Sequence, residues 1–396
     1  MSHATSRPAL RPVPAGWARA TVPVLGWVAA LGALAFVIGL FVEPQRAWTG
    51  LLIGFHALVA LALAGPVGLA FLHLSGGRWA RAIECVPRAM AGALPAAAAA
   101  GAVLLFGIHS LFEWSHATAV ADDVILAQKA AYLNTPFFAL RLVVFFAIWI
   151  WAGRRVVRAS AEAPGDTPAE RRRRLRAAAV FLLLFAPTWS LASIDWLQSL
   201  EPHWFSTIYA LLTLAGLAVG GVAAVIVLAA ARDTHDEVSD DQWGDLGALL
   251  LALALFWAYI WYSQYLLVWY TNLPEETPWY EARLGAEWGL LTKAACVLCG
   301  ALPFTLLLFR RLRRSRRALV RIAAVVLAGR LVDLWVLAGP PLMGATPRLG
   351  PFEVLPVLGA VALFFCLVLR ALRRPEAAPA AVAGSVPSPL PGVHRA

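Results

Sequence analysis

The sequence is poor in charged residues. Only 14% of its residues are Asp, Glu, Lys or Arg, whereas 60% are hydrophobic, and the mean hydropathy is +0.71. Soluble domains carry about 25% charged residues. Apolar runs close to the length of about 20 residues that crosses a bilayer recur along the whole chain. These features exclude a soluble globular domain and indicate a polytopic membrane protein.

A regular alternation of apolar and polar residues is also absent. The strands of an outer-membrane barrel alternate over about ten positions, and the apolar runs of this sequence do not. We therefore predict an all-α polytopic membrane protein with about ten transmembrane helices. The spans are expected near residues 22–42, 50–74, 90–112, 135–153, 177–198, 204–231, 244–270, 287–309, 318–339 and 353–372.

Cysteine is scarce, with four residues in the chain. A structural zinc site or an iron–sulfur cluster usually needs four ligands. The C-x-x-C of Cys296 and Cys299 has no second pair and no nearby histidine, and the C-x-x-C-H of a covalent haem is missing. We expect no metal and no redox cofactor on this chain. Cys296 and Cys299 are interpreted as small apolar residues that pack on one helix face.

Lysine is nearly absent: of 33 basic residues only Lys129 and Lys293 are lysines. The arginines gather in alternate loops, most densely in 154–176 and 310–317. Because short arginine-rich loops stay in the cytoplasm, both termini are predicted to be cytoplasmic. The loop 232–245 is acidic although it lies on the same side, but acids contribute little to this rule. A topological role for the arginines argues against nucleic acid as a partner.

Eight ionisable residues are expected inside spans or at their ends, where a charge is costly and marks a functional candidate. They are His56, His109, Glu113, Arg141, Asp195, Lys293, Arg330 and Asp333. Nearly all fall between the membrane midplane and the outer surface when they are counted along their spans. We predict a polar pathway or a head-group site in that half of the membrane. The alternative for any single residue is a structural ion pair or a side chain that snorkels to the surface.

The charges repeat with an offset of four spans. Spans four and eight each carry a base soon after entering from the outer side, Arg141 and Lys293, and spans five and nine each carry an acid near the outer end, Asp195 and Asp333. An offset of four preserves direction, so we infer two parallel four-helix bundles flanked by spans one and ten. Each bundle is predicted to hold one buried base–acid pair, since an unpaired charge is expensive to bury.

The predicted domain organisation follows from these spans. Residues 1–20 form a cytoplasmic N-terminal tail, 21–375 form the membrane domain, and the Ala/Pro-rich residues 376–396 form a disordered tail. The two repeat units cover about residues 50–198 and 204–339.

Two histidines raise an alternative function. His56 and His109 lie at similar predicted depth on neighbouring spans, and a b-type haem would be held by imidazoles on facing helices. Small residues, Gly54 and Gly107, stand nearby. Glycine is frequent in membrane spans, however, so we expect no haem on this pair.

Three stretches of the sequence are similar to a known family. They are FEWSHATAVADDVILAQKAAYLNTPFFALR (112–141), SIDWLQSLEPHWFSTIYA (193–210) and YSQYLLVWYTNLPEETPWY (262–280). Over about residues 20–375 the chain resembles the ActF-type subunits of bacterial alternative complex III, which are membrane proteins of the NrfD/polysulfide-reductase type. The positions that match the family's motifs, without an assigned role, are Trp114, His116, Asp195, His203 and Glu275.

The resemblance implies an integral subunit of a quinol:cytochrome c oxidoreductase in the bacterial inner membrane. Such a subunit binds no redox metal itself; haem c and iron–sulfur clusters belong to periplasmic partner subunits, and an NrfD-like paralogue is another partner. The family is regarded as contacting menaquinone or ubiquinone and as a candidate proton conductor. Two other classes remain open. One is a structural anchor, and the other is a secondary transporter, whose helices would be broken at matching depths.

Overall fold

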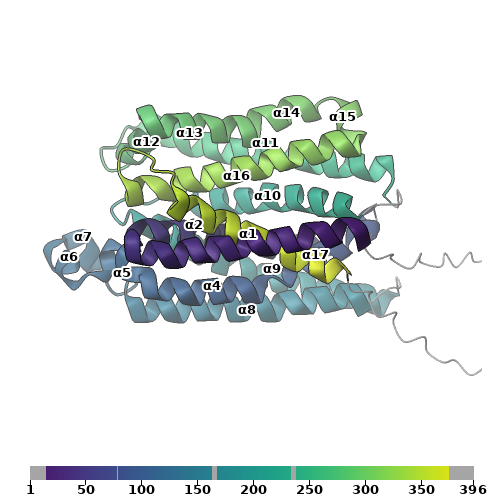
Figure 1. Cartoon of the computed structure of the whole chain (residues 1–396), viewed down its shortest axis with the longest axis horizontal. Coiled ribbons are helices and arrows are strands. Elements are labelled where there is room, and N and C mark those ends of the chain that lie inside the picture. The colour runs from purple at the N-terminus through teal and green to yellow at the C-terminus, as the bar shows by residue number, and fades with distance from the viewer. Residues whose placement is uncertain (1–14, 78, 163–166, 233–237, 374–396) are drawn as a thin grey trace, which may run out of the picture.

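The computed structural model describes residues 15–77, 79–162, 167–232 and 238–373 (Figure 1). Every regular element in these residues is a helix, and ten of the helical segments are long and apolar enough to cross a membrane. The chain is therefore an all-α, multi-pass integral membrane protein, as the sequence predicts. The predicted disorder of 376–396 falls outside the described residues.

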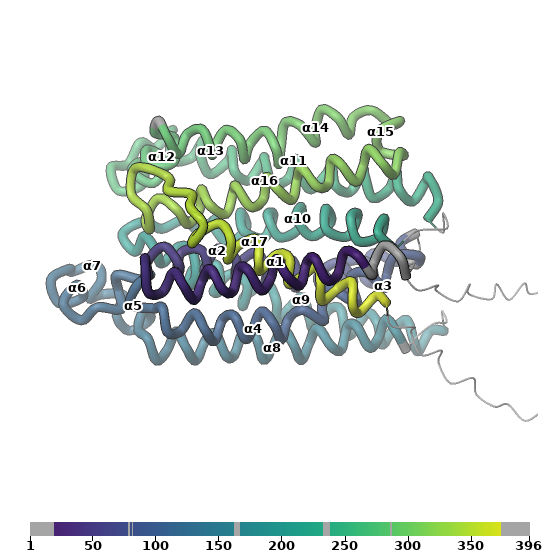
Figure 2. The backbone as a smooth tube through the Cα atoms, in the orientation of Figure 1, coloured from purple at the N-terminus to yellow at the C-terminus, as the bar shows by residue number. Residues whose placement is uncertain are grey.

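Eight of the ten crossings are single helices. They are α1 (Ala15–Val42), α2 (Pro44–Ser75), α8 (Thr135–Glu162), α9 (Pro168–Trp196), α10 (Tyr209–Arg232), α11 (Asp240–Thr271), α16 (Arg316–Met343) and α17 (Pro351–Arg373). The third crossing combines α3 (Cys85–Ala91), α4 (Leu94–Leu104), η2 (Leu105–Gly107) and α5 (Ile108–Leu111). The eighth combines α13 (Ala286–Cys296), the π-helical turn η5 (Val297–Ala301) and α14 (Leu302–Leu307), which Figure 2 traces as one rod.

Short helices occupy the connections. They are η1 (Trp79–Ile83), η3 (Glu113–Ser115), α6 (Ala117–Asp122), α7 (Val124–Lys129), η4 (Gln198–Leu200), α12 (Thr277–Leu284) and α15 (Arg310–Arg314). Residues 113–134, which join the third and fourth crossings, carry η3, α6 and α7 and project beyond the other helices in Figure 1.

The helices begin and end where local chemistry dictates. α9 starts at a capping box, in which the side chains of Thr167 and Glu170 each accept a hydrogen bond from the other residue's backbone N–H. α11 starts at the equivalent box of Ser239 and Gln242. α11 ends at Asn272, the one described non-glycine residue with a positive φ, 49°. α1 begins at Ala15, so this helix takes in the last residues of the predicted N-terminal tail 1–20.

The ten crossings pack as two groups. α2 contacts α3, α4, α8 and α9, whereas α10 contacts α11 and α16, and α16 contacts α13. The groups meet along α2, which also contacts α10 and α16. α1 and α17 pack on each other, and α17 covers α2. The internal repeat behind these two groups stays a prediction.

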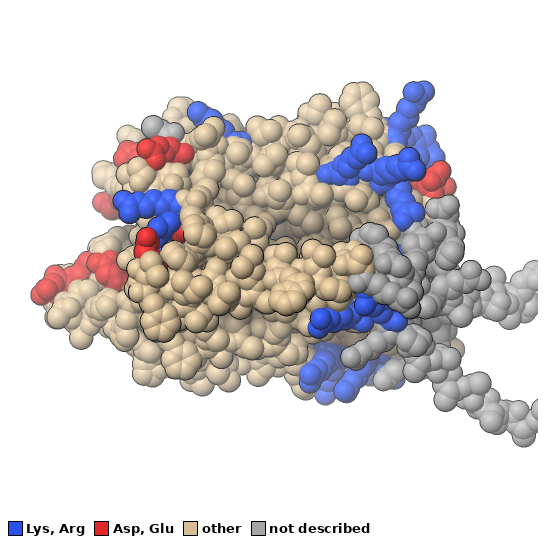
Figure 3. Space-filling model, in the orientation of Figure 1, with Lys and Arg blue, Asp and Glu red and all other residues tan. Residues whose placement is uncertain are grey.

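Charge is divided between the two ends of the bundle (Figure 3). One end carries α15, the C-terminal turns of α8 and the first turns of α9, and we call it the arginine-rich end. The opposite end carries α5 to α7, η4 and α12, and most of the acidic side chains visible in Figure 3 lie there. We call it the loop-rich end. By the positive-inside rule, the arginine-rich end is predicted to be the cytoplasmic one.

Candidate functional site

The first buried ion pair joins α8 to α9. Arg141 donates from Nε to Asp195 Oδ2 at 2.7 Å and from Nη2 to Asp195 Oδ1 at 3.0 Å, and the two side chains are 6% and 1% exposed. Such a two-pronged geometry is the strongest that a guanidinium and a carboxylate can form. The predicted pairing of these two residues is confirmed.

Aromatic residues hold this pair in place. The Arg141 guanidinium lies 3.9 Å from the ring centre of Tyr132 and 4.3 Å from that of Phe137, and its Nη1 donates to Tyr132 O at 2.9 Å. Burial raises the pKa of Tyr132, and the nearby carboxylate of Asp195 raises it further. Tyr132 therefore stays a neutral phenol beside the pair. Arg141 lies six residues along α8, about 9 Å from its start at the loop-rich end.

The second buried ion pair lies within α16 and corrects our prediction. Asp333 is 1% exposed and accepts a hydrogen bond from Nη1 of Arg330, one turn earlier in the same helix. Lys293, the predicted partner, is exposed on α13. The predicted pairing of Lys293 with Asp333 is therefore wrong. Arg330 already neutralises the carboxylate, and α13 turns Thr292 inward instead, where its hydroxyl donates to Arg283 O at 2.7 Å.

A small cavity lies where the two helix groups meet. Its volume is about 50 Å³, and α2, α10, α16 and α17 supply its walls, with His56, Thr213 and Arg330 as the polar residues. One water needs roughly 10–15 Å³ of such space, so the cavity has room for a few water molecules. The His56 ring is also near Trp189 and Trp196 of α9, at 5.6 and 6.4 Å between ring centres.

A glycine on α10 makes room for Arg330. A Cβ atom at Gly216 would lie 2.1 Å from Nη2 and 2.5 Å from Cζ of Arg330. Two further glycines follow on the same helix, and all three line the cavity: Gly216, Gly220 and Gly221. Any larger residue at Gly216 would push the guanidinium out of its place, so this glycine positions the charge beside the cavity.

Several polar atoms around this centre have no hydrogen-bond partner within the described part of the chain. They are His56 Nδ1, both amide atoms of Gln264 and, apart from an interaction between these two side chains, Asp333 Oδ1 and Trp257 Nε1. Trp257 and Gln264 lie seven residues apart and are both buried, so they share one face of α11, and the Trp257 ring centre is 5.9 Å from Arg330 Cζ. Gln264 lies about 10 Å nearer the loop-rich end than Trp257. Unpartnered buried polar groups usually mark bound water or a functional role.

The remaining predicted residues lie at the surface of the loop-rich end. His109 and Glu113 are exposed, and His109 Nδ1 lies 3.0 Å from Ser115 Oγ. His109 lies in the last turn of the third crossing, which ends at Leu111, and Glu113 lies just beyond it, so both stand at the end of the span but neither is buried. His56 and His109 thus have unrelated surroundings, which argues against a shared haem.

The motif positions are divided between surface and core. His116 and Glu275 are exposed, and Nε2 of His116 lies 2.8 Å from His109 O. Trp114 is 3% exposed and packs against Phe112 and Phe138, with ring centres 5.0 and 5.5 Å away. We therefore assign Trp114 to packing of the loop-rich end.

A fully buried arginine lies in α12, outside the predicted spans. Arg283 of α12 is 0% exposed and binds Glu201 Oε2 from Nη2 at 2.6 Å. The same guanidinium donates to Val336 O at 3.0 Å and to Leu337 O at 2.8 Å. These carbonyls have no helical donor, because the residues four positions later are Pro340 and Pro341, which lack an N–H. Arg283 therefore replaces two missing hydrogen bonds of α16.

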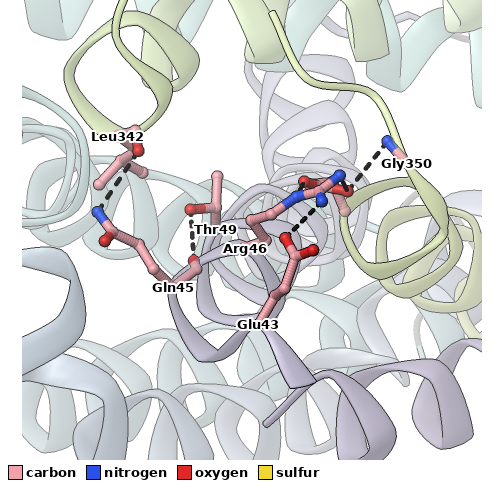
Figure 4. Close-up of polar contacts among 7 residues, drawn as sticks. Glu43, Gln45, Arg46, Thr49, Leu342 and Gly350 are labelled. Carbon is pink, nitrogen blue, oxygen red and sulfur yellow. Dashed lines mark hydrogen bonds and ion pairs between the residues drawn. The ribbon is translucent and has the colours of Figure 1, made fainter. Parts of the chain in front are cut away.

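A second overlooked pair ties α2 to α17 (Figure 4). Glu353 is 0% exposed, and Arg46 contacts both of its carboxylate oxygens, with 3.0 Å between Nη2 and Oε2. Glu353 also accepts from the Gly350 N–H at 3.0 Å, and Arg46 contacts Glu43 as well. In contrast to Asp333, Glu353 has both oxygens bound. Arg46 and Glu353 therefore have the features of a structural pair.

The loop containing His203 is tied to α7 by a pH-sensitive contact. His203 Nε2 lies 2.5 Å from Asp123 Oδ2, and Asp123 also caps α7 by accepting from the N–H groups of Ile125 and Leu126. The hydrogen bond with His203 lowers the pKa of the Asp123 carboxyl, and the two backbone N–H groups lower it further. A lowered folded-state pKa adds stability above the ordinary value, and this contribution disappears as the pH falls through the folded value.

Asp123→Asn should therefore loosen residues 117–129 near neutral pH and have no effect in acid. Asparagine keeps the helix cap but not the charge. We expect the corrected hydrogen exchange of this segment to be faster in the variant at about pH 6, and the difference to disappear as the pH falls through the lowered pKa of the Asp123 carboxyl. A difference that stays constant over this range would show that the carboxylate charge is not responsible.

Comparison with models of known protein families finds no match for this chain, and no curated protein matches it either. The candidate site is therefore defined by the geometry of this structure alone. It has two buried Arg–Asp pairs, a histidine beside a water-sized cavity, and unpartnered polar atoms between this cavity and the loop-rich end.

Proposed function

We propose that this chain is an integral subunit of a quinol-oxidising respiratory complex and that it conducts protons through the polar centre of its loop-rich half. The position of His56 and Arg330 at the cavity, with Asp333 bound to Arg330 one helical turn away, carries the proposal. The similarity of residues 112–141, 193–210 and 262–280 to ActF-type subunits of alternative complex III supports the choice of complex.

Incomplete hydrogen bonding distinguishes this centre from a structural ion pair. Glu353 has both carboxylate oxygens occupied, whereas Asp333 Oδ1 has no well-aligned hydrogen bond among the described residues, although the Trp257 indole interacts with this carboxylate. His56 Nδ1 has no partner among the described residues either. A buried atom without a partner costs about 1–3 kcal/mol. Water in the cavity, which His56 lines, would offset that cost at the imidazole, and imidazole and carboxylate groups linked by water can accept and release protons.

The same cavity is not a quinone site. Its volume of about 50 Å³ is roughly a third of the 150 Å³ or so that admits a benzene ring. We therefore assign proton transfer, and not quinone contact, to His56 and its neighbours. Menaquinol or ubiquinol would be oxidised to the quinone elsewhere in the complex, and the two protons that the quinol releases would be the cargo of this path.

The proposal also implies an orientation of the chain in the membrane. The arginine-rich end would lie in the cytoplasm of a bacterial inner membrane, with both termini there. The loop-rich end would face the periplasm and meet partner subunits that carry haem c and iron–sulfur clusters, beside an NrfD-like paralogue. The acidic and aromatic loops at this end form the contact surface available to them.

The experiment uses the complex isolated through a tag on this chain and reconstituted in liposomes. Haem c and iron–sulfur subunits should co-purify with the tagged chain. His56→Leu and Asp333→Asn should each lower quinol-driven proton movement by about tenfold or more, because each removes a group that exchanges protons. His116→Gln, an exposed histidine at the loop-rich end, is the matched control and should behave as wild type.

Three outcomes would overturn the proposal. An intact complex in which both variants keep wild-type turnover and proton movement would show that the centre carries no protons. A complex that loses subunits on a native gel but keeps its turnover per assembled complex would identify the chain as a structural anchor. A tagged chain that brings down no haem protein would reject the respiratory assignment.

A further inference from the structure

The lipid-facing surface of α8 changes character near the arginine-rich end. Along most of the helix the exposed side chains are apolar, as at Leu140, Val143 and Val144. The last turns of the same helix expose Arg154, Arg155 and Arg158. An apolar stripe that ends in arginines is typical of the boundary between the hydrocarbon core and the head groups of a bilayer. Most of the basic side chains visible in Figure 3 lie at this end of the molecule.

A pocket opens on one side of these arginines, between α3, α4 and α8. Its volume is about 320 Å³. Three guanidinium groups supply its charge: Arg88, Arg154 and Arg158. Its remaining wall is mostly apolar, with Leu94, Pro95, Ile150 and Val157 among the lining residues. No carboxylate lines this pocket within the described part of the chain.

A second pocket opens on the other side of α8, against α9. Its volume is about 390 Å³, and its charge comes from four arginines: Arg155, Arg158, Arg173 and Arg176. Arg158 lines both pockets, so they adjoin each other across α8. Arg155 is held over the ring of Trp151, with 4.2 Å between its Cζ and the ring centre. This pocket too has an apolar part, which includes Val180, and no carboxylate among its described lining residues.

We propose that the two pockets form one binding site for an anionic phospholipid whose head group carries two phosphates. Arginine keeps its charge at all accessible pH values and binds phosphate oxygens in pairs. Basic pockets between membrane helices on one side of a bilayer recognise such head groups. One phosphate would lie in each pocket, with Arg158 between them, and the acyl chains would follow the apolar stripe of α8. The site is separate from the proton path and does not depend on it.

Native mass spectrometry of the full chain in detergent tests this site. The probes are tetraoleoyl cardiolipin with two phosphates, dioleoyl phosphatidylglycerol with one, and neutral dioleoyl phosphatidylcholine. We expect the two-phosphate lipid to bind about tenfold more tightly than the one-phosphate lipid, since it engages both pockets. Arg154→Gln/Arg158→Gln should weaken binding of the two-phosphate lipid by about tenfold or more.

The control removes the same charge from the same end of the molecule. Arg310→Gln/Arg311→Gln changes two exposed arginines that line neither pocket, and binding should change less than about twofold. Arg154→Lys/Arg158→Lys keeps the charge and so controls for a folding defect in the glutamine variant. It should bind the two-phosphate lipid more weakly than wild type and more tightly than the glutamine variant.

Three results would overturn the proposal. Equal weakening in the control would show that only the overall charge matters. Equal affinity for the one-phosphate and two-phosphate lipids would exclude a bridging head group. Displacement of bound lipid by millimolar inorganic phosphate would identify a site for free phosphate, because such a ligand needs no acyl chains.

Discussion

Replacing Asp195 with leucine should destabilise the protein by about 3–5 kcal/mol, the usual cost of breaking a buried ion pair. Asp195 supplies both oxygens that bind the Arg141 guanidinium, at 2.7 and 3.0 Å. Without them a cation would remain in a position where it is only 6% exposed. Arginine cannot lose its charge in a protein, so deprotonation cannot relieve the destabilisation.

The reverse change should cost less. In Arg141→Met the lone aspartate can bind a proton and become neutral, which is how a buried carboxyl avoids an unpaired charge. The double variant Arg141→Met/Asp195→Leu leaves no charge at all and should be more stable than either single variant. The expected order of destabilisation is Asp195→Leu, then Arg141→Met, then the double variant.

Denaturant unfolding in mixed micelles, followed by tryptophan fluorescence, measures these differences. Asp241→Asn is the control, because Asp241 pairs with Arg314 at the surface, where the side chains are 77% and 41% exposed. A surface pair contributes about 0–1 kcal/mol. A loss for Asp195→Leu no greater than that of Asp241→Asn would mean that the buried pair does not hold α8 to α9.

The sequence predicts the first ion pair because its two members lie at the same depth on neighbouring spans. Arg141 and Asp195 lie near the loop-rich ends of consecutive antiparallel spans, so counting residues along the spans brings them to a common depth. The same count fails for Lys293, since depth does not specify which face of a helix a residue occupies. Thr292 faces inward and Lys293 outward, although they are neighbours in the chain.

Two other features could not be predicted by counting residues along the spans. The cavity at His56 depends on where α2, α10, α16 and α17 converge and on the room that Gly216 leaves for Arg330, and sequence spacing specifies neither. Arg283 and Glu353 were missed for another reason: both lie near loops, where charge is normally hydrated. The adjacent Pro340 and Pro341 were the available signal, since two prolines in one span leave two carbonyls in need of donors.

The largest effect outside the first ion pair is expected for Arg283→Met, at about 3–5 kcal/mol. The change removes the donors for Val336 O and Leu337 O and the partner of Glu201. Hydrogen exchange should rise in α12 and in the last turns of α16. Arg348→Met, an exposed arginine at the same end, should change neither the stability nor the exchange by a measurable amount.

A second pair of substitutions separates the two roles of Arg283. Pro340→Ala/Pro341→Ala gives α16 back the N–H groups that its carbonyls lack. If Arg283 mainly replaces these hydrogen bonds, the alanine pair should restore about half or more of the stability lost in Arg283→Met, while it adds little to a chain that retains Arg283. No recovery in the Arg283→Met background would assign the effect to the ion pair with Glu201 instead. Glu201 is 24% exposed and can hydrate when its partner is gone, so we expect the larger share to belong to the two carbonyls.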